Sequence, residues 1–112
     1  MKVEYQEYTP DDWWKMTESR REYGVKSPKV YNVHYENGDT FFLRCFYCGD
    51  IAGLGGHQQS GMIHIENGIV DISGAGACSI GGHGHLDDSA KICPAHYHIY
   101  KGEVVLDCGW SP

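Results

Sequence analysis

The sequence predicts one mainly β domain spanning residues 1–112, built from antiparallel hairpins with a single short N-terminal helix. A chain of 112 residues has the length of one domain rather than two. From Val30 onward, apolar and polar residues alternate with a period of two, which is typical of β-strands. Fifteen glycines and four prolines supply many turns, and 41% hydrophobic residues indicate a folded chain rather than a disordered one.

The helix is predicted from its start and stop signals. Thr9 suits the N-cap, Pro10 suits the first helical position, and Asp12 stands where a capping box places its acidic residue. The helix would run to about Tyr23, and Gly24 would end it.

Trp13, Trp14 and Tyr23 are the aromatic residues of this predicted helix. Trp13, Met16 and Tyr23 would share a face that packs on a sheet, so we expect residues 1–29 to form a helical N-terminal extension packed on the β domain. We interpret Trp13 and Trp14 as core or interface residues rather than as part of a ligand site.

Three segments are each predicted to form a hairpin, with a strand, a turn dipeptide ending in glycine and a return strand. Asn-Gly is among the strongest short hairpin signals, because both central residues of a type I′ turn need positive φ. The segments cover residues 31–45, 61–73 and 95–108, with Asn-Gly, Asn-Gly and Lys-Gly turns.

A histidine stands four residues before the turn glycine in each hairpin, at His34, His64 and His98. Three imidazoles in equivalent positions suggest a metal site. We favour the simpler interpretation that they are solvated cross-strand residues, since alternation places them on the polar side of each hairpin. In a two-residue turn, His64 would face Asp71 across the ladder.

Two cysteine motifs carry the strongest chemical signal. Cys45 and Cys48 form a C-x-x-C-G turn with Gly49, in which two thiolates can face one ion while backbone N–H groups point at the sulfurs. Cys93 and His96 form a C-P-x-H turn with the same spacing. Three sulfurs and one imidazole make a four-ligand set that suits tetrahedral Zn²⁺.

The third hairpin refines this prediction. A Lys-Gly turn would place Asp107 opposite His96, so the Asp107 carboxylate could orient the imidazole without binding the metal itself. Cys108 would lie beside Ala95 and is therefore the reserve fourth ligand.

The paired turns resemble those of zinc-ribbon proteins and the zinc site of type B methionine sulfoxide reductases, in which two C-x-x-C turns staple a β-fold. The resemblance covers the two half-sites, with His96 where that reductase family has cysteine. The catalytic R-x-C-x-N element of that family is absent, and Cys108 lies in L-D-C-G-W. The resemblance implies a metal-stapled β architecture.

Residues 93–105 also resemble the second cluster box of Rieske proteins, C-P-x-H followed by a glycine turn and a strand. This resemblance implies a [2Fe-2S] electron-transfer protein with two cysteine and two histidine ligands. The ligands would be Cys78, His83, Cys93 and His96, with His85 as a substitute for His83. In place of the C-x-H of the first box, this chain has Cys-Ser-Ile from residue 78.

Charge and cysteine content limit the classes of partner. Nine basic and fifteen acidic residues give a net charge of -6, which disfavours nucleic acid and anionic membranes. Five cysteines in a sequence without a recognisable export signal favour a reducing cytoplasm with thiols available for metal.

We therefore expect a non-enzymatic structural-zinc domain that binds a protein partner through its acidic and aromatic surface. The second alternative is the Rieske-like electron-transfer protein. The third is a small metal-dependent enzyme that uses spare imidazoles, drawn from His57, His83, His85, His96 and His98.

Overall fold

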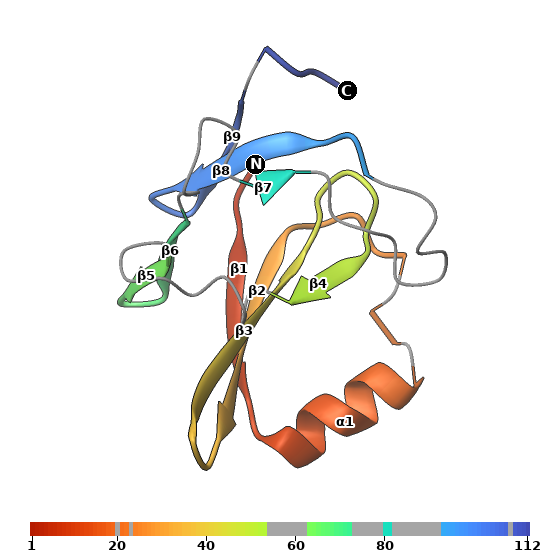
Figure 1. The fold of residues 1–112 in the computed structure, drawn as a ribbon, viewed down its shortest axis with the longest axis vertical. Helices are drawn as coiled ribbons and strands as arrows, with labels where there is room; N and C mark the ends of the chain where they lie inside the picture. The colour runs from red at the N-terminus through yellow and green to blue at the C-terminus, as the bar shows by residue number, and fades with distance from the viewer. Residues whose placement is uncertain (20, 23, 54–62, 73–79, 82–92, 108) are drawn as a thin grey trace.

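The computed structural model describes residues 1–19, 21–22, 24–53, 63–72, 80–81, 93–107 and 109–112. These residues form two β-sheets and one helix, which confirms the predicted mainly β class (Figure 1). The helix, α1 (Pro10–Ser19), has ten residues, and within the described residues no helix is long and apolar enough to span a membrane.

The first sheet has four strands in the order β1-β2-β3-β4. β1 runs parallel to β2, and the other neighbours are antiparallel. The strands are β1 (Glu4–Tyr8), β2 (Lys29–Tyr35), β3 (Gly38–Arg44) and β4 (Ile51–Gly53).

The second sheet has five strands, and β8 lies at its centre, paired with β6, β7 and β9. All of its pairs are antiparallel. The strands are β5 (Ile63–Glu66), β6 (Ile69–Ile72), β7 (Ile80–Gly81), β8 (His96–Tyr100) and β9 (Glu103–Leu106).

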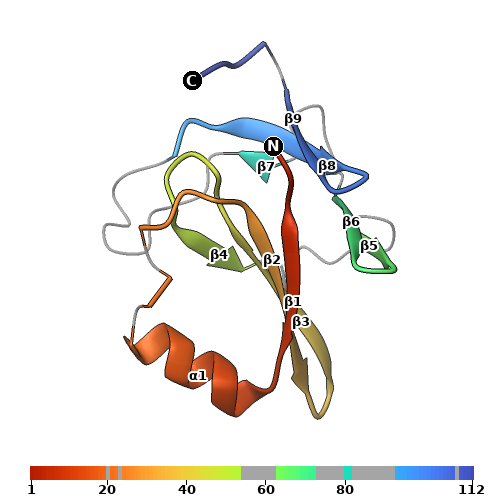
Figure 2. The same cartoon turned by 180° about the vertical axis from the view of Figure 1, so that it is seen from behind.

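The first sheet is covered on both faces along β2, whose first five residues are buried. On one face, Tyr31 and Val33 of β2 pack against Trp13 and Met16 of α1 (Pro10–Ser19). On the other face, Val30 belongs to the core that the two sheets share. Figures 1 and 2 accordingly show α1 and the β8–β9 hairpin on opposite sides of the first sheet. The molecule is therefore layered as helix, sheet and sheet.

The three predicted hairpins are present as β2–β3, β5–β6 and β8–β9. Two have the expected type I′ turns, with positive φ at Asn67-Gly68 and Lys101-Gly102. In the first hairpin, however, Tyr35 pairs with Gly38, so the turn consists of Glu36 and Asn37.

The prediction that Asn37 and Gly38 form the centre of the first turn is therefore wrong. The two turns differ in strand pairing by two residues, because the expected turn would pair Phe42 with Val33 and the observed turn pairs it with Tyr31. Both pairings leave Phe42 on the face of Trp13, where the ring centroids are 4.4 Å apart, and Phe41 on the face of the core between the sheets. The alternation along β3 therefore does not distinguish the two turns.

The helix begins as predicted, with the Asp12 N–H donating to Thr9 Oγ1 at 3.1 Å. It ends at Ser19 rather than at Tyr23. The N-terminal extension also contains the unpredicted strand β1, so residues 1–29 are not purely helical.

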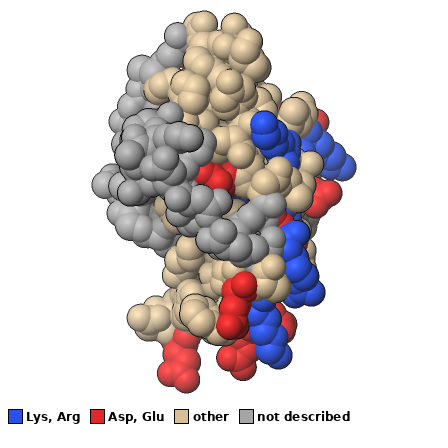
Figure 3. Space-filling view, turned by 90° about the vertical axis from the view of Figure 1, so that its right-hand side faces the viewer, with Lys and Arg blue, Asp and Glu red and all other residues tan. Residues whose placement is uncertain are grey.

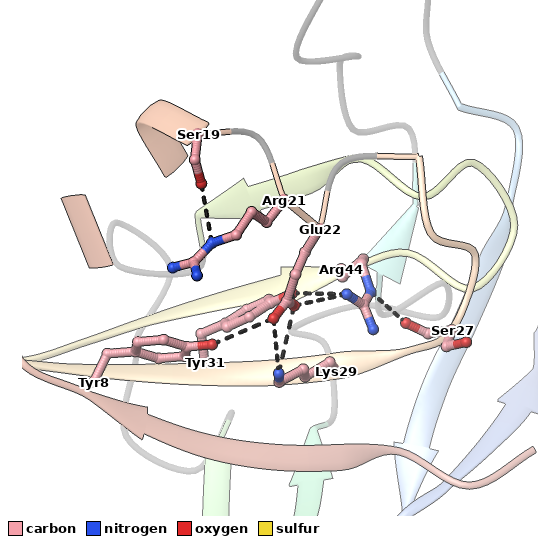
Figure 4. A network of polar contacts seen from close by, with 8 residues as sticks. All are labelled: Tyr8, Ser19, Arg21, Glu22, Ser27, Lys29, Tyr31 and Arg44. Carbon is pink, nitrogen blue, oxygen red and sulfur yellow. Dashed lines mark hydrogen bonds and ion pairs between the residues drawn. The ribbon is translucent and has the colours of Figure 1, made fainter. Parts of the chain in front are cut away.

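Glu22 explains the early end of the helix, because its carboxylate leaves the helical path to meet buried cations (Figure 4). Tyr31 donates to Glu22 Oε2 at 2.5 Å, Arg44 approaches the same oxygen at 2.7 Å, and Lys29 approaches Oε1 at 3.2 Å. Arg44 also donates to the carbonyl of Ser27 at 2.6 Å. The connection from α1 to β2 is thereby fixed to the first sheet.

Charges on the surface are mixed in sign. Figure 3 shows lysine and arginine side chains interspersed with aspartate and glutamate along one side of the face that it presents.

Candidate metal centre

The first half of the predicted site is a tight turn at the end of β3. The Cys45 N–H donates to the carbonyl of Asp50, and the Gly49 N–H donates to the carbonyl of Cys45, both at 3.0 Å. The Tyr47 N–H points at Cys45 Sγ at 3.3 Å, and the Asp50 N–H points at the sulfur of Cys48. Donation of backbone N–H groups to sulfur is the arrangement predicted for a metal-binding turn.

Gly49 is required by the geometry of this turn. It has a φ of 80°, and a Cβ at this position would lie 2.9 Å from the carbonyl oxygen of Val25. The sequence prediction for Gly49 is confirmed, because a side chain would meet both backbone strain and a clash.

The second half of the site is the segment that leads into β8. Cys93 is fully buried, and the N–H of Ala95 donates to its sulfur. This turn therefore presents Cys93 to the core between the sheets, opposite the turn at the end of β3.

The three cysteines meet in this core. The sulfurs of Cys45, Cys48 and Cys93 all lie within 4.8 Å of one another, and Cys45 Sγ is 3.9 Å from Cys93 Sγ. These two residues are 48 positions apart in the chain. The fold therefore brings together three of the four predicted ligands, close enough to hold one metal ion.

Burial disfavours the thiolate form of these cysteines when no cation is nearby. It raises the pKa of Cys48 to about 12 and also raises the pKa of Cys93, while the backbone N–H groups act in the opposite direction. A bound metal ion would supply the missing positive charge and keep the thiols deprotonated.

His96, the fourth predicted ligand, lies at the start of β8 and outside the group of three sulfurs. Its Nδ1 is buried and has no hydrogen-bond partner among the described residues. The prediction that Asp107 orients His96 is wrong, because Asp107 Oδ1 instead pairs with His98 Nδ1 at 2.7 Å. The Asp107 side chain reaches diagonally across the hairpin, although its N–H bonds to the His96 carbonyl as the register predicts.

Several other predicted ligands lie outside the described residues. They are Cys108, Cys78, His83, His85 and His57.

Among the described residues, the group of side chains close enough to hold a metal ion consists of Cys45, Cys48 and Cys93. The histidines of the three hairpins do not form such a group in this part of the chain. His64 faces Asp71 as predicted, but Asp71 accepts a hydrogen bond from the Lys101 N–H at 2.7 Å. His34 and His64 are exposed, in agreement with the solvated interpretation.

Aromatic residues that were not among the predicted site residues enclose the cysteines. Tyr97 is fully buried, and its hydroxyl lies next to Cys45 with no well-formed hydrogen bond to any described residue. Phe46 packs edge-on against Tyr97 and Trp110, and Tyr47 packs against Trp110 with centroids 5.2 Å apart. Alternation along β8 already placed Tyr97 on the inner face, which was the available signal.

The fold and site thus define a small two-sheet β domain with a cluster of three cysteines, two of them buried and one half-buried. Comparison of the chain with protein-family models, curated proteins and solved structures finds no match.

Proposed function

We propose that Cys45, Cys48 and Cys93 bind one structural Zn²⁺, with His96 as the fourth ligand and Cys108 in reserve. The grouping of three sulfurs within 4.8 Å of one another supports this proposal. Three thiolates and one imidazole suit zinc, which favours tetrahedral sulfur and nitrogen sets. Ligation would also satisfy the buried Nδ1 of His96, which has no partner among the described residues.

The ion would act as a staple between the sheets. Cys45 directly follows β3 of the first sheet, and Cys93 leads into β8 of the second. A metal that joins these segments adds folding free energy to a chain of 112 residues, whose core is small.

We propose that the stapled domain is an interaction or assembly module rather than an enzyme. Cys45 and Cys93 are 1% and 0% exposed and Cys48 is half-buried, so a metal between them would be open to substrate at most on the Cys48 side. The turn that holds the ion also presents Tyr47, 38% exposed, beside Trp110. An exposed aromatic pair on a rigid turn is a surface that suits a protein partner.

Metal content in paired cysteine variants tests the site. We expect about one zinc per chain, lost in Cys48→Ser and retained in Cys78→Ser. The Rieske-like alternative predicts the reverse, with iron and sulfide that depend on Cys78 and not on Cys48. Zinc retained in Cys48→Ser would overturn the proposed ligand set.

Cobalt substitution tests whether the site is structural or catalytic. Four protein ligands leave no open position, so the visible spectrum of the Co²⁺ form should not change when azide is added. A spectrum that changes with azide would indicate an exchangeable position and would favour the metal-dependent enzyme.

Proximity labelling in cells tests the proposed partner surface. Some proteins that the unsubstituted protein labels should no longer be labelled by the Tyr47→Ser variant, although the two proteins contain the same amount of metal. If both proteins label the same set, Tyr47 is not part of a partner surface.

A further inference from the structure

A second candidate site, independent of the cysteines, lies where the two sheets diverge. A groove of about 440 Å³ opens there, between β1–β3 on one side and β5 on the other. Its volume is in the range of small-molecule sites. Glu7, His34 and Asp39 line it from the first sheet, while Ile63 and Ile65 line it from β5.

Two carboxylates in this groove share one imidazole. His34 Nδ1 lies 2.7 Å from Asp39 Oδ1, and His34 Nε2 lies 3.5 Å from Glu7 Oε2. The hydrogen bond to Asp39 raises the pKa of His34, and Glu7 adds to this effect. The two acidic groups therefore favour the protonated, cationic form of the imidazole between them.

The side-chain amide of Asn32 donates a hydrogen bond to the Asp39 carboxylate. Asn32 is 4% exposed, and its Nδ2 donates to Tyr5 Oη at 3.0 Å and to Asp39 Oδ2 at 3.3 Å. A flipped amide would turn its oxygen toward the Asp39 carboxylate, so this orientation is chemically required. Asn32 Oδ1 is consequently a buried acceptor with no donor among the described residues. It lies in a residue that lines the groove.

The geometry favours an organic cation over a metal ion. Among the described residues, no three side chains of the groove bring ligand atoms within 4.8 Å of one another, as the cysteines do. Phe41, Ile63 and Ile65 provide an apolar wall beside the carboxylates. An alkyl chain could lie against this wall while its charged end meets Asp39 and Glu7.

We propose that this groove binds an ammonium or guanidinium group carried on an apolar stem. The cation takes the place of the imidazole between Asp39 and Glu7. The net charge of -6 of the whole chain also favours a positively charged ligand.

The test is an NMR titration of the intact chain with n-butylammonium at low ionic strength. We expect saturable shifts in β1, the β2–β3 hairpin and β5, and none of similar size with 1-butanol. N-acetyl-lysine methylamide serves as a second probe. Tighter binding of this probe would indicate a protein side chain as the natural source, and tighter binding of butylammonium would indicate a free amine.

Three substitutions on the exposed surface make the test specific. Asp39→Asn should weaken binding roughly fivefold, and His34→Asn should strengthen it because the internal competitor is gone. Glu4→Gln is the matched control, since Glu4 is an exposed carboxylate of β1 that does not line the groove.

Equal weakening by Asp39→Asn and Glu4→Gln would overturn the proposal, because the effect would then be one of net charge. Binding of 1-butanol as tight as that of n-butylammonium would show that the groove binds alkyl chains and does not recognise the positive charge. Selective broadening of the groove resonances by Mn²⁺, without a response to butylammonium, would assign it to a metal ion instead.

Discussion

Replacement of Tyr97 by phenylalanine removes one buried hydroxyl beside the proposed metal. Tyr97 is 0% exposed, and its hydroxyl lies next to Cys45 without a well-formed hydrogen bond to any described residue. A neutral thiol is a weak acceptor, but a thiolate bound to zinc accepts hydrogen bonds strongly. We therefore expect the hydroxyl to donate to the Cys45 sulfur when the metal is present.

The size of the effect follows from the charge of the acceptor. A hydrogen bond to a charged group contributes about 1.5 kcal/mol at the lower end of its range, which corresponds to about tenfold in affinity. Tyr97→Phe should therefore weaken zinc binding about tenfold, measured by competition with a chromophoric chelator.

A spectroscopic control separates this role from simple loss of stability. In the Co²⁺ form, loss of a hydrogen bond to sulfur should move the sulfur-to-cobalt charge-transfer band to longer wavelength. Tyr31→Phe is the matched variant, because Tyr31 is equally buried but donates to Glu22. Tyr31→Phe should lower stability and leave the band in place. A band that does not move in Tyr97→Phe, or moves equally in both variants, would refute the reasoning.

Three further predictions concern the fold, with stability measured by urea unfolding and zinc affinity by competition with a chromophoric chelator. Burial alone would raise the pKa of Glu22, but its hydrogen bonds and buried cations bring it below the ordinary value. The stability that Glu22 provides is therefore present above about pH 4.5 and lost as the pH falls through the lower folded-state pKa. Glu22→Gln should lower the free energy of unfolding by about 2–3 kcal/mol at pH 7 and make it depend less on pH in the acid range. An unchanged pH dependence of stability in the acid range would contradict this prediction. Trp13→Ala should cost about 3–5 kcal/mol because Trp13 is buried against Phe42, whereas exposed Trp14→Ala should change stability by less than about 0.5 kcal/mol. Similar losses in both would show that α1 does not pack as described. Gly49→Ala should lower stability and zinc affinity by at least about 1 kcal/mol each, and Gly53→Ala, which has ordinary φ and only van der Waals contacts, should lower zinc affinity much less. Equal zinc affinities in the two glycine variants would count against the strained turn.

Local patterns were sufficient to predict the hairpins and the helix start. Alternation and turn dipeptides predicted β5–β6 and β8–β9 in their correct register, and Thr9 marked the beginning of α1. Such features depend on neighbouring residues, so they are visible in the sequence.

The errors in the fold arose where distant residues decide the structure. The end of α1 depends on Glu22 reaching Lys29 and Arg44, which no local signal reveals. β1 is a largely polar edge strand, and its parallel partner β2 lies more than twenty residues away. The first turn lies one residue before its Asn-Gly signal, and it pairs Phe42 with Tyr31 rather than with Val33, a choice that the turn dipeptide does not reveal.

The site shows the same division. Spacing within the chain identified Cys45, Cys48 and Cys93, and the structure brings their sulfurs together. The role assigned to Asp107 failed because a carboxylate can also reach its diagonal neighbour, here His98. Tyr97 was missed because an inward-facing tyrosine has no sequence signature that distinguishes a donor to sulfur from a core residue.

X-ray absorption at the zinc edge of the purified, intact chain measures the proposed coordination most directly. We expect one zinc per chain with three sulfurs at about 2.3 Å and one nitrogen at about 2.0–2.1 Å, or a fourth sulfur in its place if Cys108 is the ligand. A shell with fewer than three sulfurs would contradict convergence of the three cysteines on one ion.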